Sequence, residues 1–186
     1  MDEEFVPNFG LGVDYIRGLR ALTSIPLDLH LMITNPEYKL QWIGIRQTDI
    51  VTIHYESTFQ VQRALDWLAP YGCKRFLAIN PATPVYVLEE VLDSIDGVNL
   101  LMVNPGFAGQ KMVQSTMKKA EKLRQFLVDN GREDILVEKD GNITPENGAR
   151  LRKNGARIFV AGSSSVFQGP VSGYGKRIDD FRAAVE

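Results

Sequence analysis

Short apolar runs recur along this chain at intervals that suit alternating strands and helices. Most of them are rich in Leu, Ile and Val with little polar alternation, which is typical of strands buried on both faces. They follow one another at roughly 25 residues, with one longer step before Ile135, and this is about the length of a strand, a helix and two short loops. The predicted strands are Leu27–Ile33, Ile50–His54, Arg75–Ile79, Asn99–Val103, Ile135–Lys139 and Arg157–Ala161.

Helix starts follow several of these strands. In three places a side chain that can cap a helix stands directly before a proline, and proline suits the first helical turn. These pairs are Asn35-Pro36, Thr83-Pro84 and Thr144-Pro145. Apolar residues at helical spacing predict the helices themselves. The predicted ranges are Gln60–Ala69, Val85–Leu92 and Gln110–Asn130.

The regular strand–helix repeat, without a linker or low-complexity tract, predicts a single domain over residues 1–186. Its class is α/β, with a parallel sheet covered by helices. Two architectures share this pattern, an open doubly wound sheet and a closed barrel. Closure takes eight strands and usually at least about 200 residues. From the alternation alone, an open sheet is therefore the more economical interpretation.

Composition narrows the class of partners. The net charge is -2, which argues against nucleic acid, because phosphate backbones are bound by a strong basic excess. A small anion stays compatible, since a few backbone N–H groups bind one phosphate without Lys or Arg. The single cysteine, Cys73, allows no intrachain disulfide and favours a reducing cytoplasm. No apolar run is long enough to cross a membrane, and the acidic N-terminus has no signal-peptide pattern.

Both histidines of the chain, His30 and His54, stand at the ends of predicted strands. Catalytic groups of parallel α/β proteins gather at the carboxyl ends of strands. A partly buried histidine with a structural role is the simpler interpretation of either one alone. The equivalent placement of both favours a functional role for the pair.

Three glycine-containing turns follow the later strands. Glycine lets the backbone approach a ligand closely, and the start of the next helix offers free N–H groups to an anion. Any one of them is more simply explained as ordinary turn chemistry, whereas three in succession favour a phosphate pocket. The turns are Asn104–Gln110, Glu138–Asn142 and Ala161–Ser165.

Asp140 stands at the end of a strand beside the second of these turns. A carboxylate in this position can transfer protons or bind a metal, although Asp before Gly is also a common turn pair. Lys139 is unusual in a buried strand. We expect its side chain to point toward the helix layer or to extend outward to solvent.

Taken in chain order, these segments resemble the ribulose-phosphate 3-epimerase family, and the resemblance covers nearly the whole chain. The turn Asn-Pro-Gly-Phe-Ala-Gly-Gln at 104–110 is the most specific of them. The matching segments are Met1-Asp2, Phe5–Asn8, Asp28–Ile33 with Pro36, His54–Glu56, Val103–Gln110, Glu138–Ile143 and Val160–Ser163.

The resemblance implies an eight-stranded barrel that interconverts ribulose 5-phosphate and xylulose 5-phosphate, in the pentose phosphate pathway of carbohydrate metabolism. The proton beside the ketone is removed and returned to the other face, which needs two acid/base groups. In the family, two aspartates serve as that pair and, with two histidines, hold a divalent metal that stabilises the enediolate. A His/carboxylate set suits Zn, Mn, Fe or Co comparably. The implied partner is a small phosphorylated ketose.

By the same resemblance, Asp140 is a catalytic acid/base and a metal ligand, and His30 is a metal ligand that also contacts the substrate. Met32 lines the substrate pocket, and His54 and Glu56 lie near the site without binding the metal. The resemblance assigns substrate and phosphate binding to Gly106, Phe107, Ala108, Gly109, Gly141, Asn142, Gly162 and Ser163.

The sequence also departs from the family. The other His and Asp ligands lie on a strand just before the Met-Asp pair that opens this chain. The resemblance therefore implies a (β/α)8 barrel lacking its first strands, together with one acid/base and two metal ligands. Exposed sheet edges then predict a homo-oligomer. Glu3-Glu4 replaces Gly and usually His, and Leu101 replaces a common pocket Met. Asn142 replaces a second Gly, and Asn is the least costly substitute if the backbone there is left-handed.

Three functions are open at this point. The first is a sugar-phosphate 3-epimerase, acting on ribulose 5-phosphate or on a hexulose 6-phosphate such as allulose 6-phosphate. The second is a non-catalytic sugar-phosphate-binding paralogue or inactive fragment, which the absent acid/base favours. The third is another phosphate-binding barrel, such as a decarboxylase or isomerase. The pairing of His30 with Asp140 and the 104–110 turn argue against this third function.

Overall fold

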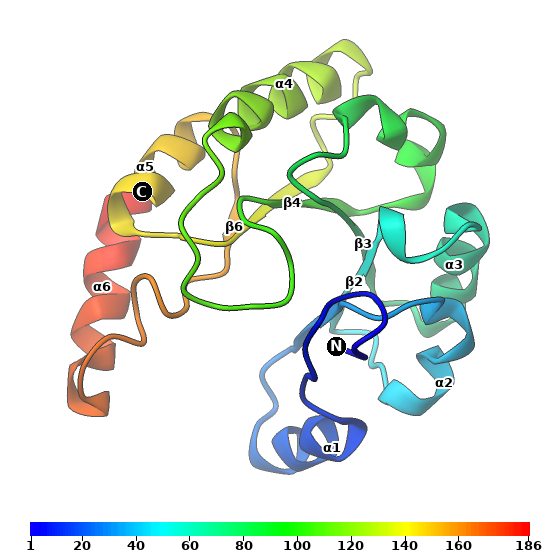
Figure 1. Cartoon of the computed structure of the whole chain (residues 1–186), viewed down its shortest axis with the longest axis horizontal. Coiled ribbons are helices and arrows are strands. Elements are labelled where there is room, and N and C mark those ends of the chain that lie inside the picture. The colour runs from blue at the N-terminus through cyan, green and yellow to red at the C-terminus, as the bar shows by residue number, and fades with distance from the viewer. The chain divides into compact units, whose positions relative to one another are not determined.

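The computed structural model describes all residues 1–186, and the chain forms two compact units. The first unit comprises Met1–Ala78 and Leu88–Gly97, and the second comprises Ile79–Val87 and Val98–Glu186. Figure 1 follows the strands and helices of both from the N-terminus to the C-terminus. No helix in the chain is both long enough and apolar enough to span a membrane.

The first unit is built on three parallel strands in chain order. β1 pairs with β2, and β2 pairs with β3. The strands are β1 (Asp28–Leu31), β2 (Ile50–His54) and β3 (Lys74–Ile79). Val51, Thr52 and Ile53 are consecutive and fully buried, so both faces of β2 are covered, as its unbroken apolar run predicts. The helices are α1 (Val13–Leu22), α2 (Leu40–Ile43) and α3 (Val61–Leu68), with the short 3-10 turns η1 (Pro36–Tyr38), η2 (Tyr55–Ser57) and η3 (Ala69–Tyr71).

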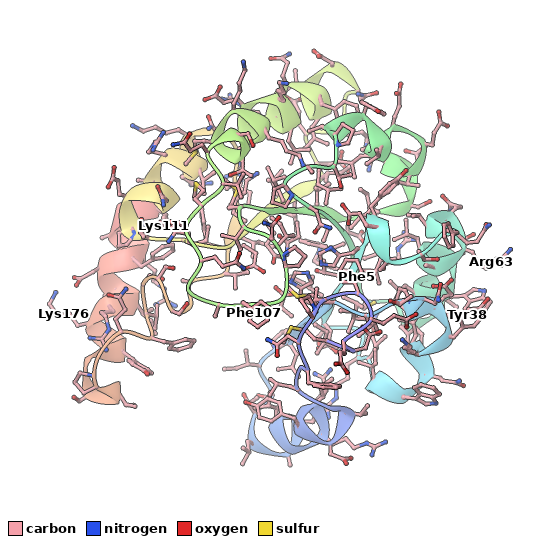
Figure 2. All side chains as sticks on the ribbon, in the orientation of Figure 1. Phe5, Tyr38, Arg63, Phe107, Lys111 and Lys176 are labelled. Atoms are coloured by element: carbon pink, nitrogen blue, oxygen red, sulfur yellow. The ribbon has the colours of Figure 1, made fainter.

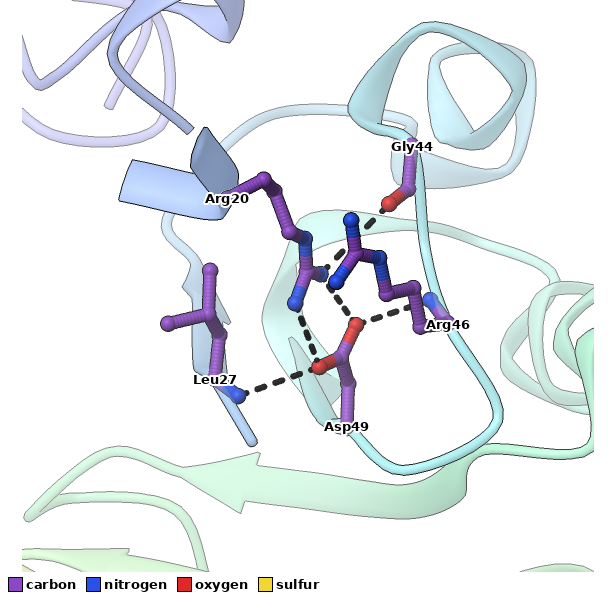
Figure 3. A network of polar contacts seen from close by, with 5 residues as sticks. All are labelled: Arg20, Leu27, Gly44, Arg46 and Asp49. Carbon is purple, nitrogen blue, oxygen red and sulfur yellow. Dashed lines mark hydrogen bonds and ion pairs between the residues drawn. The ribbon is translucent and has the colours of Figure 1, made fainter. Parts of the chain in front are cut away.

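A buried carboxylate ties α1 to the starts of β1 and β2. Asp49 accepts hydrogen bonds through both oxygens from the guanidinium group of Arg20 (Figure 3). It also accepts from the backbone N–H groups of Arg46 at 2.8 Å and Leu27 at 3.0 Å. Arg20 donates in addition to the carbonyl oxygen of Gly44 at 3.4 Å. Every oxygen of this buried charge is therefore engaged by donors, which is the condition under which burial of a carboxylate is tolerated.

We expect Asp49→Asn to lower the free energy of unfolding by about 1.5–3 kcal/mol at neutral pH. Burial alone would raise the pKa of Asp49, but the hydrogen bonds from Arg20, Arg46 and Leu27 outweigh it, so the net pKa lies below its usual value. A lowered folded-state pKa means that the stabilisation is present above about pH 4 and is lost as the pH falls through that pKa. Urea denaturation over a pH series measures the difference in free energy of unfolding between Asp49→Asn and the unmodified protein. This difference should shrink at acid pH, and a constant difference would contradict the assignment.

The matched control for this substitution is Asp14→Asn. Asp14 pairs with Arg17 on the exposed side of α1 at 2.8 Å, and its side chain is 94% exposed. An ion pair this exposed contributes little, so the free energy of unfolding should change by less than about 0.5 kcal/mol at any pH in the series.

Gly97 ends the first unit directly against the ring of Phe76 on β3. A Cβ atom added to Gly97 would lie 2.2 Å from Cζ of Phe76, which is itself fully buried. Carbon atoms overlap at that distance, so no larger residue fits beside this ring.

The second unit carries the remaining strands, again in chain order, and β5 pairs with β6 in parallel. The strands are β4 (Gly97–Leu101), β5 (Leu136–Asp140) and β6 (Ile158–Phe159). The helices are α4 (Ser115–Asp129), α5 (Pro145–Lys153) and α6 (Tyr174–Val185), with the 3-10 segments η4 (Val85–Ser94), which begins in this unit, and η5 (Val171–Gly173). Leu100 of β4, Met102 directly after it and Leu123 of α4 are fully buried in its core.

All six predicted strands are present, and the strand order tests the two architectures left open by the sequence. A doubly wound sheet reverses its order at a switch point. Within each unit the order follows the chain without reversal, which is the arrangement of a (β/α) barrel. The interpretation as an open doubly wound sheet is therefore wrong, and the barrel class is confirmed.

The helix predictions were less accurate. The predicted helix at Gln110–Asn130 begins only at Ser115, and Val85–Leu92 lies in a 3-10 helix rather than an α-helix. Neither α1 nor α6 was predicted. Of the capping pairs, Thr144 accepts a hydrogen bond from the N–H of Asn147 at 3.1 Å. Asn35 does not cap, because it adopts a left-handed conformation with φ 46.

Candidate functional site

In the first unit the two histidines lie against each other. β1 carries His30 and β2 carries His54, and their Nε2 atoms are 2.7 Å apart. The rings stack with centroids 4.9 Å apart at an angle of 15°. One proton occupies the space between two nitrogens at this distance, so one ring donates and the other accepts. The two histidines that the sequence places at the ends of successive strands are therefore neighbours in the structure, and a functional role for the pair stays a prediction.

The surroundings of His54 differ from those of His30. His54 is fully buried, the ring of Phe5 lies 4.7 Å from it, and Oε2 of Glu56 lies 3.4 Å from its Nδ1. His30 is half-buried at the end of β1. Of the two, His30 is thus the more accessible imidazole. It contacts the buried His54, which in turn contacts Glu56.

Asp2 is occupied elsewhere in the same unit. Its Oδ2 accepts from the N–H of Thr34 at 2.7 Å and from Nζ of Lys39 at 2.9 Å. Burial opposes ionisation, but the hydrogen bonds from Phe5, Lys39 and Thr34 prevail and lower the pKa of Asp2 to about 2. Asp2 is therefore a carboxylate that anchors the N-terminal segment.

In the second unit, the loop after β4 is shaped by its glycines. Gly106 and Gly109 have φ of 116 and 79, in the region that disfavours side chains. Nε2 of Gln110 donates to the carbonyl oxygens of Asn104 at 2.7 Å and Phe107 at 2.8 Å, and so closes the loop. Phe107, which is labelled in Figure 2, is 54% exposed on this loop. A fixed loop with exposed backbone suits contact with a ligand.

The loop after β5 contains two successive residues with positive φ, Gly141 at 102 and Asn142 at 53. A Cβ atom on Gly141 would lie 2.5 Å from a methyl group of Val103, so a side chain is excluded there. Asn142 occupies the left-handed region, as expected from its replacement of a second glycine. The conformation of this turn is therefore specified by both residues.

We expect Asn142→Ala to lower the free energy of unfolding by about 1–2 kcal/mol, because alanine is strained in the left-handed region. Asn142→Gly serves as the matched variant. It relieves the backbone and loses two weak side-chain bonds, one from Nδ2 of Asn142 to Oγ of Ser164 at 3.3 Å and one from Nδ2 of Asn147 to Oδ1 of Asn142 at 3.4 Å. Thermal unfolding should rank alanine below glycine in stability. Both variants lack the amide group, so they differ in backbone preference alone, and the reverse order would contradict the assignment of strain to the left-handed backbone at residue 142.

Hydrogen bonds connect the three glycine loops within the second unit. The N–H of Met102, at the start of the first loop, donates to the carbonyl oxygen of Asp140 at 2.7 Å. Asn142 of the second loop donates to Ser164 of the third. A Cβ atom on Gly162 would meet nothing within 4 Å, so the backbone of the third loop is open on that side. These hydrogen bonds link the three glycine loops to one another, and Asp140 is half-buried within the second loop. A phosphate pocket at these loops stays a prediction.

Two buried polar groups beneath these loops were missed by the sequence analysis. Nδ2 of Asn99 on β4 donates to Oε1 of Glu138 on β5 at 2.9 Å, and both residues are fully buried. Side chains alternate along a strand, so Glu138 lies on the same face as Asp140. The signal was present in the sequence as a charged residue inside a buried apolar run.

Lys139 lies on the opposite face of β5 from Glu138 and Asp140. Its side chain is fully buried, and its Nζ has no hydrogen-bond partner. Burial, with a smaller contribution from the charge of Lys119 on α4, lowers the pKa of Lys139 to about 7. The expectation that this side chain extends outward to solvent is wrong. The effect of Lys119, which belongs to α4, agrees with the alternative expectation of a position toward the helix layer.

The divalent metal implied by the family resemblance needs more donors than this structure brings together. No group of three or more His, Cys, Asp or Glu side chains is arranged to hold a metal ion. Nε2 of His30 is engaged with His54. His30 belongs to the first unit and Asp140 to the second, so their pairing around one metal stays a prediction. The roles of Met32 and of the other substrate-contacting residues stay predictions as well.

Comparison with known proteins agrees with the family resemblance of the sequence motifs. The model of the Ribulose-phosphate 3 epimerase family matches residues 1–167. The chain is 36% identical to Ribulose-phosphate 3-epimerase from Bacillus subtilis, over 88% of this chain and 76% of that protein. It is 35% identical to Ribulose-phosphate 3-epimerase from Escherichia coli K12, over 98% of this chain and 80% of that protein.

Solved structures support the fold alone. 3-Hexulose-6-phosphate synthase from Salmonella typhimurium is similar with a TM-score of 0.69 at 13% identity, over 94% of this chain and 82% of that one. A mutant tryptophan synthase alpha-subunit from Pyrococcus furiosus is similar with a TM-score of 0.64 at 16% identity, over 92% and 72%.

Proposed function

Since this chain belongs to the ribulose-phosphate 3-epimerase family, we propose that it is an isomerase that interconverts ribulose 5-phosphate and xylulose 5-phosphate. The observation that carries the proposal is the connection of the three glycine loops around Asp140. An enzyme that epimerises a phosphorylated ketose needs a site for the phosphate and an acid/base group, separated by no more than the length of the substrate. The glycine loops and Asp140 of the second unit supply the residue types for both.

In the proposed reaction, Asp140 transfers the proton on the carbon beside the ketone. Its backbone is fixed by Met102, and its half-buried carboxyl group stands at the carboxyl end of β5, where catalytic groups of this fold occur. The phosphate rests on backbone N–H groups of the loops at Gly106–Gly109, Gly141, Asn142 and Gly162, which need no Lys or Arg. Anchoring the phosphate holds the reacting carbon in a constant position relative to Asp140.

The buried pair Asn99 and Glu138 helps to hold Asp140 in position. Glu138 lies two residues before Asp140 on the same face, and its bond to Asn99 ties β5 to β4 at 2.9 Å. A fixed strand end reduces the freedom of the catalytic carboxyl group. No step is assigned to a metal, because the residues of this chain that converge do not complete a site for one.

Incubation with ribulose 5-phosphate in D2O tests the proposal, with proton NMR following xylulose 5-phosphate and the exchange at the carbon beside the ketone. We expect both product formation and deuterium incorporation at that carbon. Saturable binding without exchange would instead identify a non-catalytic sugar-phosphate-binding protein. Allulose 6-phosphate in a parallel reaction distinguishes a hexulose substrate from a pentulose one.

A further inference from the structure

A cavity of about 540 Å³ lies between η1 and α3 in the first unit. Its lining comes from two short stretches, at 37–41 and 66–71, and includes none of the residues proposed for the epimerase reaction. Pockets for small molecules usually measure about 300–1,000 Å³ and combine apolar walls with a few polar groups. The size of this cavity therefore suits a second small-molecule site, made of other residues than the glycine loops.

Three aromatic side chains form much of the apolar lining. Tyr38 from η1 and Trp67 from α3 contact each other edge to face, with ring centroids 5.8 Å apart at an angle of 76°. Tyr71 of η3 lines the same cavity. Tyr38 is 56% exposed and Trp67 is 44% exposed, so packing against the core covers only part of each ring. The face of such a ring attracts a cation that lies within about 6 Å of its centre.

The charged side chains of the lining have one sign. Glu37 and Asp66 both contribute to it, whereas no Lys, Arg or His does. Asp66 is exposed, and its Oδ1 accepts a hydrogen bond from Nε2 of Gln62 at 2.8 Å. Carboxylates beside aromatic rings, without a balancing cation in the lining, favour a positively charged ligand over an anion or a neutral molecule.

Glu37 indicates which kind of cation fits. Its side chain is 6% exposed, and Oγ1 of Thr58 donates to its Oε1 at 2.9 Å. Its Oε2 is buried and has no hydrogen-bond partner. A buried carboxylate with a single neutral donor is poorly compensated. Because the terminal torsion of a Glu side chain is broad, a small rotation of the carboxyl group brings Oε2 toward the cavity. An ammonium group supplies the missing donor and the missing charge together.

We propose that this cavity binds a small alkylammonium ion. The ammonium group donates to Glu37, the exposed Asp66 adds a second negative charge, and the alkyl chain packs against Tyr38 and Trp67. A quaternary ammonium ion would attract the aromatic rings but leave Oε2 of Glu37 without a donor. An alcohol of the same length would supply a donor without the charge. Both are therefore weaker ligands for this cavity.

A titration followed by proton–nitrogen NMR of the two tryptophan indoles tests the proposal without any use of epimerase activity. Trp67 lines the cavity, whereas Trp42 does not and serves as the internal reference, and Trp42→Phe assigns the two signals. With butylammonium chloride as the probe, we expect the Trp67 signal to move and to saturate with a Kd of about 1–10 mM, while the Trp42 signal stays in place. Tetramethylammonium chloride and 1-butanol should each bind at least about tenfold more weakly.

Glu37→Gln should raise the Kd for butylammonium more than about tenfold. The glutamine keeps the size of the side chain and an oxygen that accepts from Thr58, but it removes the charge. Asp66→Asn, at an exposed position that folding does not depend on, should raise the Kd about two- to fivefold, which tests the site even if Glu37→Gln is unstable. Asp14→Asn is the matched control and should leave the Kd unchanged, because Asp14 lies outside the cavity.

A tripeptide with a central lysine, blocked at both ends, distinguishes a free amine from the side chain of a partner protein. We expect this peptide to bind no more tightly than butylammonium, and binding more than about tenfold tighter would overturn the assignment to a small molecule. An unmoved Trp67 signal, equal binding of 1-butanol and butylammonium, or a Kd unchanged by both Glu37→Gln and Asp66→Asn would each overturn the proposal as a whole.

Discussion

Asp140→Asn is expected to lower kcat/KM for ribulose 5-phosphate by about 10²–10⁴-fold, the usual contribution of one general acid or base. The asparagine side chain has nearly the same shape but accepts no proton at neutral pH. The backbone bond from Met102 to residue 140, 2.7 Å in length, does not depend on the side chain. The substitution therefore removes proton transfer while the strand end keeps its position.

Two measurements distinguish lost chemistry from lost structure. The affinity for the ketose phosphate and the thermal midpoint should stay close to those of the unmodified protein, while kcat falls. Asp180→Asn is the matched control, because Asp180 pairs with Lys176 on the exposed side of α6 at 2.6 Å. Equal activity of the two variants would remove Asp140 from the mechanism.

Lys139→Met is expected to increase the free energy of unfolding at pH 7 by up to about 4 kcal/mol, because it removes a buried amine that has no hydrogen-bond partner. Methionine fills a similar volume without a polar atom. Burial lowers the pKa of Lys139 to about 7 in the folded chain, against 10.5 for an ordinary lysine. The folded state therefore holds this amine at a cost that the unfolded state does not bear.

The same shift determines how stability depends on pH. Between pH 7 and about 10, the unfolded chain binds a proton at Lys139 that the folded chain has released, so stability rises with pH through this range. The difference between Lys139→Met and the unmodified protein should therefore shrink toward pH 10. Urea denaturation across this range measures it.

Lys119→Met provides the contrast to Lys139→Met. Nζ of Lys119 donates to the carbonyl oxygen of Asn80 at 2.6 Å, so its removal should destabilise the chain by about 1–3 kcal/mol. Opposite signs for the two buried lysines are expected. A loss of stability in both variants would mean that Nζ of Lys139 makes favourable interactions in solution.

The strands were predictable from sequence because strands buried on both faces need unbroken apolar runs, as in Val51 to Ile53. Helix α1 was not, since none of its residues is fully buried, and its sequence resembles that of many exposed segments. The late start of α4 at Ser115 follows from the preceding loop, where Val113 N–H donates to Met102 instead of entering a helix. Such a choice depends on contacts distant in sequence.

In the candidate site, local chemistry was predictable and contacts were not. The left-handed conformation at Asn142 follows from residue type, because Asn tolerates that region better than other side chains. The approach of His30 to His54 depends on the register of β1 against β2, in which His30 aligns with Thr52. The burial of Lys139 could not be predicted, because a lysine normally keeps its charged group in water and the sequence alone therefore predicts an exposed side chain.

The contact between Gly97 and Phe76 constrains how this part of the chain can evolve. Because an added Cβ atom would overlap the aromatic ring, position 97 accepts a side chain only after position 76 has become smaller. The reverse order passes through an intermediate in which the two residues collide. Divergence at these sites, 21 positions apart in sequence, therefore has a fixed direction, and descendants with alanine at 97 should carry a smaller residue at 76.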